Sequence, residues 1–299
     1  MSNMLFLCEL PDSDKEDFTK TNRSCARTLL RIYFNPEIDC RLVSESVIFT
    51  LLSEKGIGPK LYGVFNDGRL EEFIKSKTLQ TSDLWQPDMS RRIARKLASL
   101  HKLNLPIVKI PTYLTDAMER WFVKLQELKP ETCIDVGLNV HVSLGRLHEE
   151  FRLIQKAMMR SQSPVVFCHN DLQEGNILSP TENSDSNDLI VIDFEYASYN
   201  YRAFDFANHF CEWTFDYTNN SYPFYWFSNE NFPDANQQAN FFSAYLTTSG
   251  QQQMNVQNLI EETKLFVPVS HFFWAIWSLV QNEISPVKFG FAHLNIYVN

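Results

Sequence analysis

This sequence lacks the features that mark several classes of protein. It has 27 Lys and Arg residues against 36 Asp and Glu residues, and its formal net charge of -9 argues against a protein that binds nucleic acid. No apolar run reaches the roughly 18 residues that a membrane span requires. The N-terminal segment, residues 1–10, is short and carries no basic leader, so it predicts a strand rather than a signal peptide.

The sequence also lacks internal repeats, long low-complexity segments and cysteines at metal-ligand spacing. The scattered cysteines, several of them in apolar runs, predict buried free thiols in the reducing cytosol and hence a cytoplasmic protein. They are Cys8, Cys25, Cys40, Cys133, Cys168 and Cys211. A length of 299 residues, with 44% hydrophobic and 21% charged residues, is typical of a soluble globular protein with one large or two modest domains.

The order of secondary-structure signals predicts an α+β fold with two lobes. Residues 1–78 favour a small β-rich N-terminal lobe, and residues 79–299 favour a large, mainly helical C-terminal lobe. Strands are expected at residues 5–10, 26–34, 61–65 and 69–74, and a helix at 42–54. Further helices are expected at 88–103 and 141–159, and around 203–217, 235–247 and 259–284.

Aspartate and asparagine residues follow one another in the middle of the chain with a spacing that suits phosphoryl transfer. In the run Cys-His-Asn-Asp-Leu-Gln-Glu-Gly-Asn-Ile, Asp171 comes before Asn176, and Asp193 ends a later apolar run. The Ser-, Asp- and Asn-rich residues 180–188 predict the tip of a hairpin between these runs. Such a hairpin would bring Asn176 and Asp193 close enough to share metal ions.

Kinases of the protein-kinase-like fold need this arrangement. Asp171 is the candidate base, or at least the group that orients the attacking hydroxyl, while Asn176 and Asp193 are the candidate magnesium ligands. Glu195 is a candidate support for the metal shell, and Gln173 a candidate neighbour of the transferring phosphoryl group. The alternative interpretation is a polar loop beside a hairpin, in which the carboxylates only form turns.

A basic residue lies in the centre of the second expected strand. Arg31 is flanked by Leu, Ile and Tyr, and a charge in such a strand requires a partner. The predicted partner is Glu45 of the following helix, and the guanidinium would also hold nucleotide phosphates. A salt bridge at the edge of the lobe, without any ligand, is the alternative.

Aromatic residues are concentrated in the C-terminal third. Trp274 and Trp277 are three residues apart, so they share a helix face. Aromatic rings together with one carboxylate suit a quaternary ammonium ion, although this spacing also suits core packing. The candidate residues are Tyr196, Glu212, Tyr217, Trp274, Trp277 and Phe289.

The runs at residues 169–176, 192–205 and 270–277, together with 42–74, resemble the choline/ethanolamine kinase family over essentially the whole chain. The resemblance implies the two-lobed kinase-like fold, ATP, Mg²⁺ and transfer of the γ-phosphate to the choline hydroxyl, the first step of phosphatidylcholine synthesis. It also implies a dimer, either a homodimer or a heterodimer with a related subunit. Ethanolamine is an alternative substrate, but Gln173-Glu174-Gly175 resembles the choline kinases.

The resemblance also implies roles for individual residues. Asp171 would be the base, Asn176 and Asp193 would hold magnesium, and Arg31 would hold phosphate. The hinge beside adenine would consist of Glu71, Glu72, Phe73 and Ile74. The choline pocket would consist of Tyr196, Glu212, Tyr217, Trp274, Trp277 and Phe289.

Both ends of the chain depart from the family pattern. Family members carry a Gly-Gly pair just before the sequence that here begins at Met1, which leaves Ser2 and Asn3 to contact the phosphates. Residues 292–299 lack the aromatic residue that the family carries near Leu294. A catalytically weak, truncated isoform that pairs with another subunit is therefore an alternative function. An aminoglycoside phosphotransferase is disfavoured, because clustered carboxylates suit polycations better than an aromatic box does.

Overall fold

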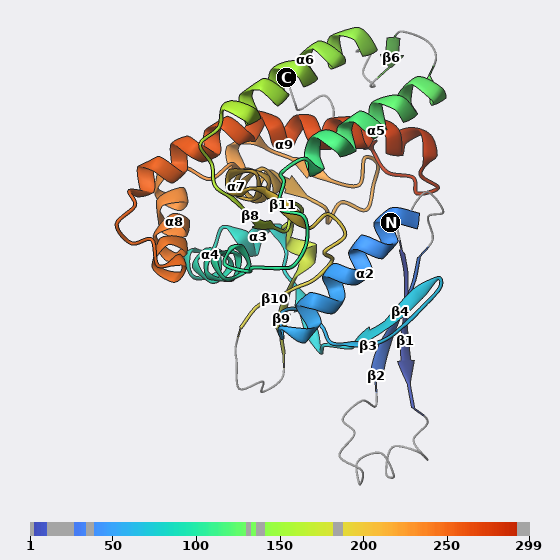
Figure 1. Ribbon diagram of the computed structural model, residues 1–299, viewed down its shortest axis with the longest axis vertical. Coiled ribbons are helices and arrows are strands. Elements are labelled where there is room, and N and C mark those ends of the chain that lie inside the picture. Colours follow the sequence, from blue (N-terminus) through green and yellow to red (C-terminus); the bar gives the residue numbers. More distant parts are fainter. Residues whose placement is uncertain are drawn as a thin grey trace. The chain divides into compact units, whose positions relative to one another are not determined.

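The computed structural model describes residues 3–10, 27–33, 39–129, 133–135, 141–181 and 188–291. The chain divides into two compact units (Figure 1). The first contains Met1–Thr78 and Asn176–Tyr196, and the second contains Leu79–Gly175 and Ala197–Asn299. One boundary falls after Thr78, and the hairpin segment groups with the first unit.

The first unit is built on an antiparallel sheet of order β1-β2-β4-β3. Its strands are β1 (Asn3–Glu9), β2 (Arg27–Tyr33), β3 (Leu61–Phe65) and β4 (Gly68–Glu72), and helix α2 (Asp39–Glu54) contacts β3. Gly68 allows β4 to approach β2, because a Cβ there would collide with the Arg31 carbonyl oxygen. A second antiparallel sheet contains β5 (Ser76–Thr78), β9 (Ile177–Pro180) and β10 (Ile190–Val191).

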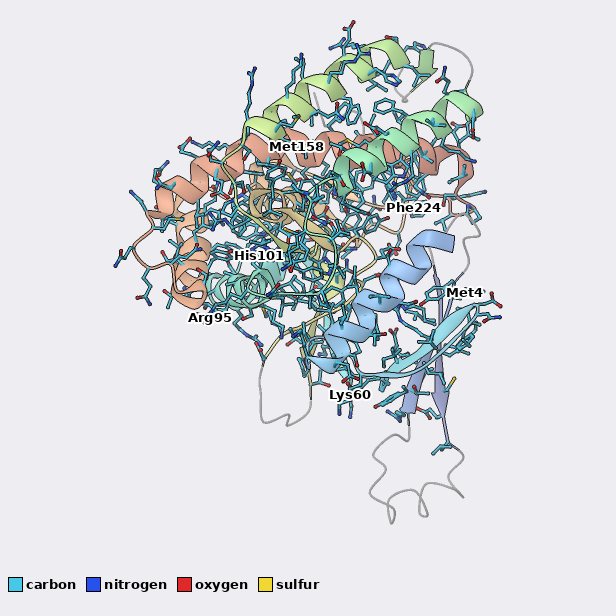
Figure 2. All side chains as sticks on the ribbon, viewed as in Figure 1. Met4, Lys60, Arg95, His101, Met158 and Phe224 are labelled. Atoms are coloured by element: carbon cyan, nitrogen blue, oxygen red, sulfur yellow. The ribbon has the colours of Figure 1, made fainter. Side chains whose placement is uncertain are left out.

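The second unit is mainly helical. Its helices are α3 (Thr81–Leu84), α4 (Pro87–His101), α5 (Tyr113–Leu128), α6 (Leu144–Arg160), α7 (Arg202–Glu212), α8 (Ala235–Ser249) and α9 (Val256–Ile284). Helix α9 packs against α5, α6, α7 and α8, and α4 packs against α8. Side chains fill the space among these helices, and the buried Met158 of α6 belongs to the same core (Figure 2). A wholly buried α7 therefore lies where it can hold polar groups away from water.

Short strand pairs complete the second unit. They are β6 (Cys133–Asp135) with β7 (His141–Ser143), β8 (Val165–Cys168) with β11 (Ser198–Tyr201), and β12 (Phe215–Asp216) with β13 (Trp226–Phe227). The 3₁₀ turn η3 (Asn229–Asn231) follows β13, and η2 (Glu174–Asn176) precedes β9. Residues 169–173 follow β8 directly, and His169 and Asn170 among them are fully buried.

The predicted α+β class is confirmed, with corrections at several boundaries. We expected a helix from residue 141, but the Ser143 side chain accepts the Arg146 N–H and caps a helix that begins at Leu144. We expected helix near residues 203–217, but α7 ends at Glu212 and residues 215–216 form β12. Helix α5 was not predicted. Cys168 and Cys211 are buried free thiols as expected, and Cys8 is half-buried.

Helix α9 differs from the expectation that no segment reaches the length of a membrane span. Among the described residues, α9 is the one helix whose length and apolar composition would allow it to cross a membrane. However, 61% of its most apolar window is buried within the protein, where Phe266, Phe273 and Ile276 join the core. Burial of this kind is what a core helix of a globular unit shows.

Candidate active site

In the first unit, the hairpin brings Asn176 and Asp193 to the same end of two paired strands. Val191 lies opposite Ile177, and the Ile192 N–H donates to the Asn176 carbonyl at 3.0 Å. This agrees with the predicted hairpin, although residues 182–187 of its tip lie outside the described part of the chain. The pairing follows from two apolar runs separated by a turn-forming stretch.

Asp193 offers an oxygen ligand that nothing else in the described chain satisfies. Its Oδ1 atom is buried without a hydrogen-bond partner among the described residues, and its Oδ2 atom lies 4.0 Å from Arg31 Nη1. A buried carboxylate oxygen without a partner is costly, and Mg²⁺ prefers oxygen ligands. The donor set of Asp193 and Asn176 therefore fits the predicted magnesium ion. Glu195 lies half-buried in the turn that follows, and its role in the metal shell stays a prediction.

The backbone at Asp193 has a conformation that is rare outside glycine. Its φ angle is +62°, in the left-handed region, where Asp and Asn are tolerated better than other side chains. Backbone strain of this kind costs on the order of 1–3 kcal/mol and persists when the surroundings hold it. This conformation suggests that the backbone fixes the orientation of the Asp193 carboxylate.

Two buried arginines in neighbouring strands share one acidic side chain. Arg31 Nε donates to Glu71 Oε1 at 3.1 Å, and Arg69 Nε donates to Glu71 Oε2 at 3.0 Å. Arg69 Nη1 also donates to Glu45 Oε1 at 2.6 Å. We predicted that Glu45 pairs with Arg31, and the structure gives Glu45 a different basic partner. The reason is register, since Arg31 lies opposite Arg69, and two buried guanidinium groups need two carboxylates.

Arg69 is the main residue of the first unit that sequence reasoning missed. Its side chain is 1% exposed, and Glu71 and Glu45 raise its pKa above the usual value against the lowering effect of burial. Its ring contact with Phe49, at 4.0 Å from guanidinium carbon to ring centroid, adds to this packing. The sequence did contain a signal for this pair, because Arg69 and Glu71 are two residues apart in β4 and therefore lie on the same face of the strand.

The predicted hinge residues lie in and just after β4, whereas the predicted phosphate-contacting residues lie at the start of β1 or before it. Glu71 and Glu72 lie in β4, Phe73 and Ile74 follow it, and the Glu72 side chain accepts the Lys60 N–H at 3.0 Å. Because both carboxylates have partners within the unit, the backbone is the more suitable part for contact with adenine. Asn3 begins β1, but its side chain, like the whole of Ser2, lies outside the described residues.

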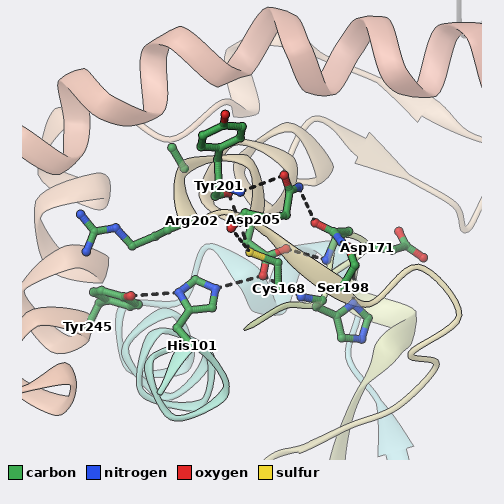
Figure 3. A network of polar contacts seen from close by, with 12 residues as sticks. His101, Cys168, Asp171, Ser198, Tyr201, Arg202, Asp205 and Tyr245 are labelled. Atoms are coloured by element: carbon green, nitrogen blue, oxygen red, sulfur yellow. Dashed lines mark hydrogen bonds and ion pairs between the residues drawn. The ribbon is translucent and has the colours of Figure 1, made fainter. Parts of the chain in front are cut away.

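In the second unit, the loop that carries Asp171 is tethered to helix α7. The N–H groups of His169 and Asn170 donate to the two carboxylate oxygens of Asp205 at 2.8 and 2.6 Å. His101, at the end of α4, approaches Asp205 Oδ2 with Nε2 at 3.0 Å, and its Nδ1 lies 2.9 Å from the Tyr245 hydroxyl (Figure 3). Burial alone would raise the pKa of Asp205, but His101 and the loop hold it below the usual value, so the tether stays ionised.

The residue before Asp171 is held in a strained conformation by further bonds. Asn170 has a φ angle of +66°. Its side chain donates to Ser198 Oγ at 2.8 Å and accepts from Asn200 Nδ2 at 2.8 Å. These bonds connect the loop to β11, so the direction in which the chain presents Asp171 is set on both sides. Nearby, the Gln173 side chain accepts the Gly175 N–H at 3.2 Å.

The tether is not itself a metal centre. His101, Cys168 and Asp205 place possible ligand atoms within 4.8 Å of one another. Burial raises the pKa of the Cys168 thiol well above its usual value, so the thiol keeps its proton. Both Asp205 oxygens already accept hydrogen bonds. The cluster is therefore a hydrogen-bonded network that supports the loop.

The predicted aromatic residues of the second unit form a continuous chain of ring contacts. The ring centroids of Trp274 and Trp277 are 5.5 Å apart, and Trp277 lies 5.7 Å from Phe291. Phe291 lies 4.9 Å from Phe289, which in turn lies 6.4 Å from Tyr217. Tyr225 and Phe291, which sequence reasoning missed, contact Phe289 as well. Tyr196 groups with the first unit, so its place in the pocket stays a prediction.

A buried carboxylate lies at one end of this aromatic chain. The Tyr217 hydroxyl donates to Glu212 Oε2 at 3.0 Å. Burial, and then the negative charge of Glu174, raise the pKa of Glu212 to about 8. Burial and Glu212 likewise raise the pKa of Tyr217, and Asp171 is among the charges that add to this shift. Asp171 therefore lies close enough to Tyr217 for its charge to act on the Tyr217 hydroxyl.

Comparison with known proteins shows the family to which the chain is related. The profile of the family described as Choline/ethanolamine kinase matches residues 1–296. "Choline kinase A2" of Caenorhabditis elegans is 46% identical over 98% of this chain and 75% of its own length. "Choline/ethanolamine kinase" of Homo sapiens is 40% identical over 97% of this chain and 74% of its own length.

Solved structures show the fold. A choline kinase from Cryptosporidium parvum, at 24% identity, superposes with a TM-score of 0.79 over 100% of this chain and 84% of its own. The aminoglycoside phosphotransferase APH(2")-IIa in its gentamicin complex, at 11% identity, superposes with a TM-score of 0.55 over 97% of this chain and 95% of its own. Both likenesses concern the fold alone, and they confirm the predicted protein-kinase-like fold.

Proposed function

Because the chain belongs to the choline/ethanolamine kinase family, we propose that it transfers the γ-phosphoryl group of ATP to the hydroxyl of choline. The product, phosphocholine, would enter phosphatidylcholine synthesis in the cytoplasm, and the enzyme would act as a dimer. The observation that carries the proposal is the position of Asp171 within electrostatic range of Tyr217, which belongs to a continuous aromatic cluster. A candidate base next to a candidate ammonium pocket is what phosphorylation of an amino alcohol requires.

Each functional group has a task that follows from its surroundings. Asp171 would orient the choline hydroxyl and take up its proton, since its loop is fixed by Asp205. Asp193 and Asn176 would hold Mg²⁺, which when bound neutralises charge on the nucleotide phosphates. Arg31 donates to Glu71 through Nε, and its guanidinium would also bind phosphate oxygens.

The ammonium group would be held by ring faces and by a carboxylate. A quaternary ammonium ion has no N–H to donate, so attraction to the rings of Tyr217, Trp274 and Trp277 replaces hydrogen bonding. Glu212 would supply the compensating negative charge. Since the pKa of Glu212 is about 8 without a ligand, a bound cation would favour its ionised form.

The test is phosphocholine formation by the purified chain with ATP and excess Mg²⁺, beside an Asp171→Ala variant. We expect turnover, with a loss of about 10²–10⁴-fold in the variant. Light scattering on the same sample would report the dimer. A folded protein that binds neither choline nor ATP would refute the proposal.

Ethanolamine is the second candidate substrate. The buried carboxylate of Glu212 is a hydrogen-bond acceptor of the kind that a primary ammonium group needs. A relative in Homo sapiens is named choline/ethanolamine kinase. Competition between the two amines at equal concentration would give the ratio of their kcat/KM values, and we expect it to favour choline because rings dominate the cluster.

A further inference from the structure

Glu174 is a buried acidic residue to which the proposed mechanism gives no task. It lies in η2, three residues after Asp171, and its side chain belongs to a residue that is 6% exposed. Its Oε2 atom is buried and has no hydrogen-bond partner among the described residues. A carboxylate oxygen in that situation is costly unless a ligand satisfies it.

The side chains around Glu174 place it beside the Tyr217–Glu212 pair. The Thr81 hydroxyl is next to the Glu174 carboxylate, but its single proton goes to the Phe215 carbonyl at 2.7 Å. The Phe215 ring stacks on Tyr217, with centroids 6.1 Å apart and planes at 11°. Tyr217 in turn donates its hydroxyl proton to Glu212. Thr81 and Phe215 therefore connect the two carboxylates through one packed layer.

The charges that act most strongly on these carboxylates are negative. Glu174 is the main charge acting on Glu212, and Asp216 is the main charge acting on Glu174. Glu174 and Glu212 are 6% and 8% exposed, so water screens their repulsion poorly. Two buried carboxyl groups beside aromatic rings ionise more readily when a cation occupies the space next to them.

We propose that Glu174 is a second carboxylate of the ammonium subsite, so that a bound amino alcohol is held by two negative charges rather than by Glu212 alone. This inference rests on the proposed function and adds a specificity-determining residue to it. The ligand class is a small organic cation that also carries a hydroxyl group. An uncharged alcohol of the same shape would gain nothing from Glu174.

The experiment compares choline with 3,3-dimethylbutan-1-ol, in which carbon replaces the charged nitrogen. Dissociation constants for both are measured at pH 9, so that protonation of carboxyl groups does not enter the comparison. Glu174→Gln should weaken choline binding on the order of tenfold and leave binding of the neutral alcohol unchanged. Glu174→Asp, which keeps the charge, should restore most of the affinity for choline.

Glu230→Gln is the matched control, since it removes one negative charge from an exposed position of the same unit. We expect it to change neither constant. Equal weakening of choline and the neutral alcohol in Glu174→Gln would show a packing role and overturn the inference. A raised Mg²⁺ requirement with unchanged choline affinity would assign Glu174 to the metal site and overturn it as well.

The outcome also separates this inference from the proposed function. If the wild-type chain binds and phosphorylates choline while Glu174→Gln binds it equally well, the inference fails and the function stands. If the folded wild-type chain binds no choline, the proposed function itself fails.

Discussion

Replacing Gly290 with alanine should damage choline binding without touching any residue that contacts ATP. The Gly290 N–H donates to the Pro223 carbonyl at 3.0 Å, and the Tyr225 hydroxyl reaches the Gly290 carbonyl at 3.5 Å. A Cβ at Gly290 would lie 2.9 Å from Pro223 Cα and 3.0 Å from its carbonyl oxygen, besides a closer collision with Pro223 Cβ. The segment therefore has to shift away from Pro223, and it carries Phe289 with it.

The magnitude follows from the cost of forcing a methyl group into a packed contact. Overpacking costs about 1–3 kcal/mol, and each 1.4 kcal/mol that reaches the pocket raises KM about tenfold. Because Phe289 lies between Tyr217, Tyr225 and Phe291, we expect KM for choline to rise about tenfold in Gly290→Ala. The value of kcat at saturating choline and KM for ATP should change less than twofold by the same reasoning.

Steady-state kinetics with choline and ATP varied separately would check this prediction. Gly145→Ala is the matched control, because a Cβ at Gly145, in the first turn of α6, meets no atom within 4 Å. That variant should keep both KM values and gain slightly in stability. An unchanged KM for choline in a folded Gly290→Ala protein would refute the argument that the segment of Phe289 and Gly290 positions the aromatic pocket.

Three further predictions concern the buried charges. Arg69→Met leaves Glu45 without its buried guanidinium partner and removes one of the two that hold Glu71, so urea unfolding should show a loss of about 3–5 kcal/mol. The same change at the exposed Arg95 should cost little. The pKa of Glu212 is raised from 4.5 to about 8, so the folded state binds more protons than the unfolded state between these values, and stability falls as pH rises through that window. Glu212→Gln should flatten this part of a plot of Tm against pH, and an unaltered slope would contradict the assignment. Choline affinity of the wild-type chain should rise as pH passes about 8, because the ionised carboxylate is the form that attracts the cation.

The parts of the site that depend on neighbouring residues in the chain were accessible from the sequence. The hairpin that aligns Asn176 with Asp193 follows from two apolar runs and a turn-forming stretch between them. The helix at residues 42–54 was predicted from one apolar face, and it begins at Asp39. Trp274 and Trp277 were expected on one face of a helix, and their rings are in contact.

The parts that depend on packing between distant segments were not accessible. Arg69 takes the partner that we assigned to Arg31, because the register between β2 and β4 sets the pairing. Asp205 carries the loop of Asp171 from a position 34 residues further along the chain, as the sequence numbering shows. A charged residue in the apolar α7 was a signal of a buried partner, but no pattern in the sequence identified that partner.

The tether between Asp205 and the loop of Asp171 has a consequence for how natural variation in this chain would be interpreted. His101 and Tyr245 are buried among helices and are not among the predicted binding residues, yet they complete the hydrogen bonding of the carboxylate that holds the loop. Changes at these positions would therefore lower specific activity by more than the accompanying loss of folded protein explains. For this chain, depth in the helical core is not evidence that a substitution is remote from catalysis.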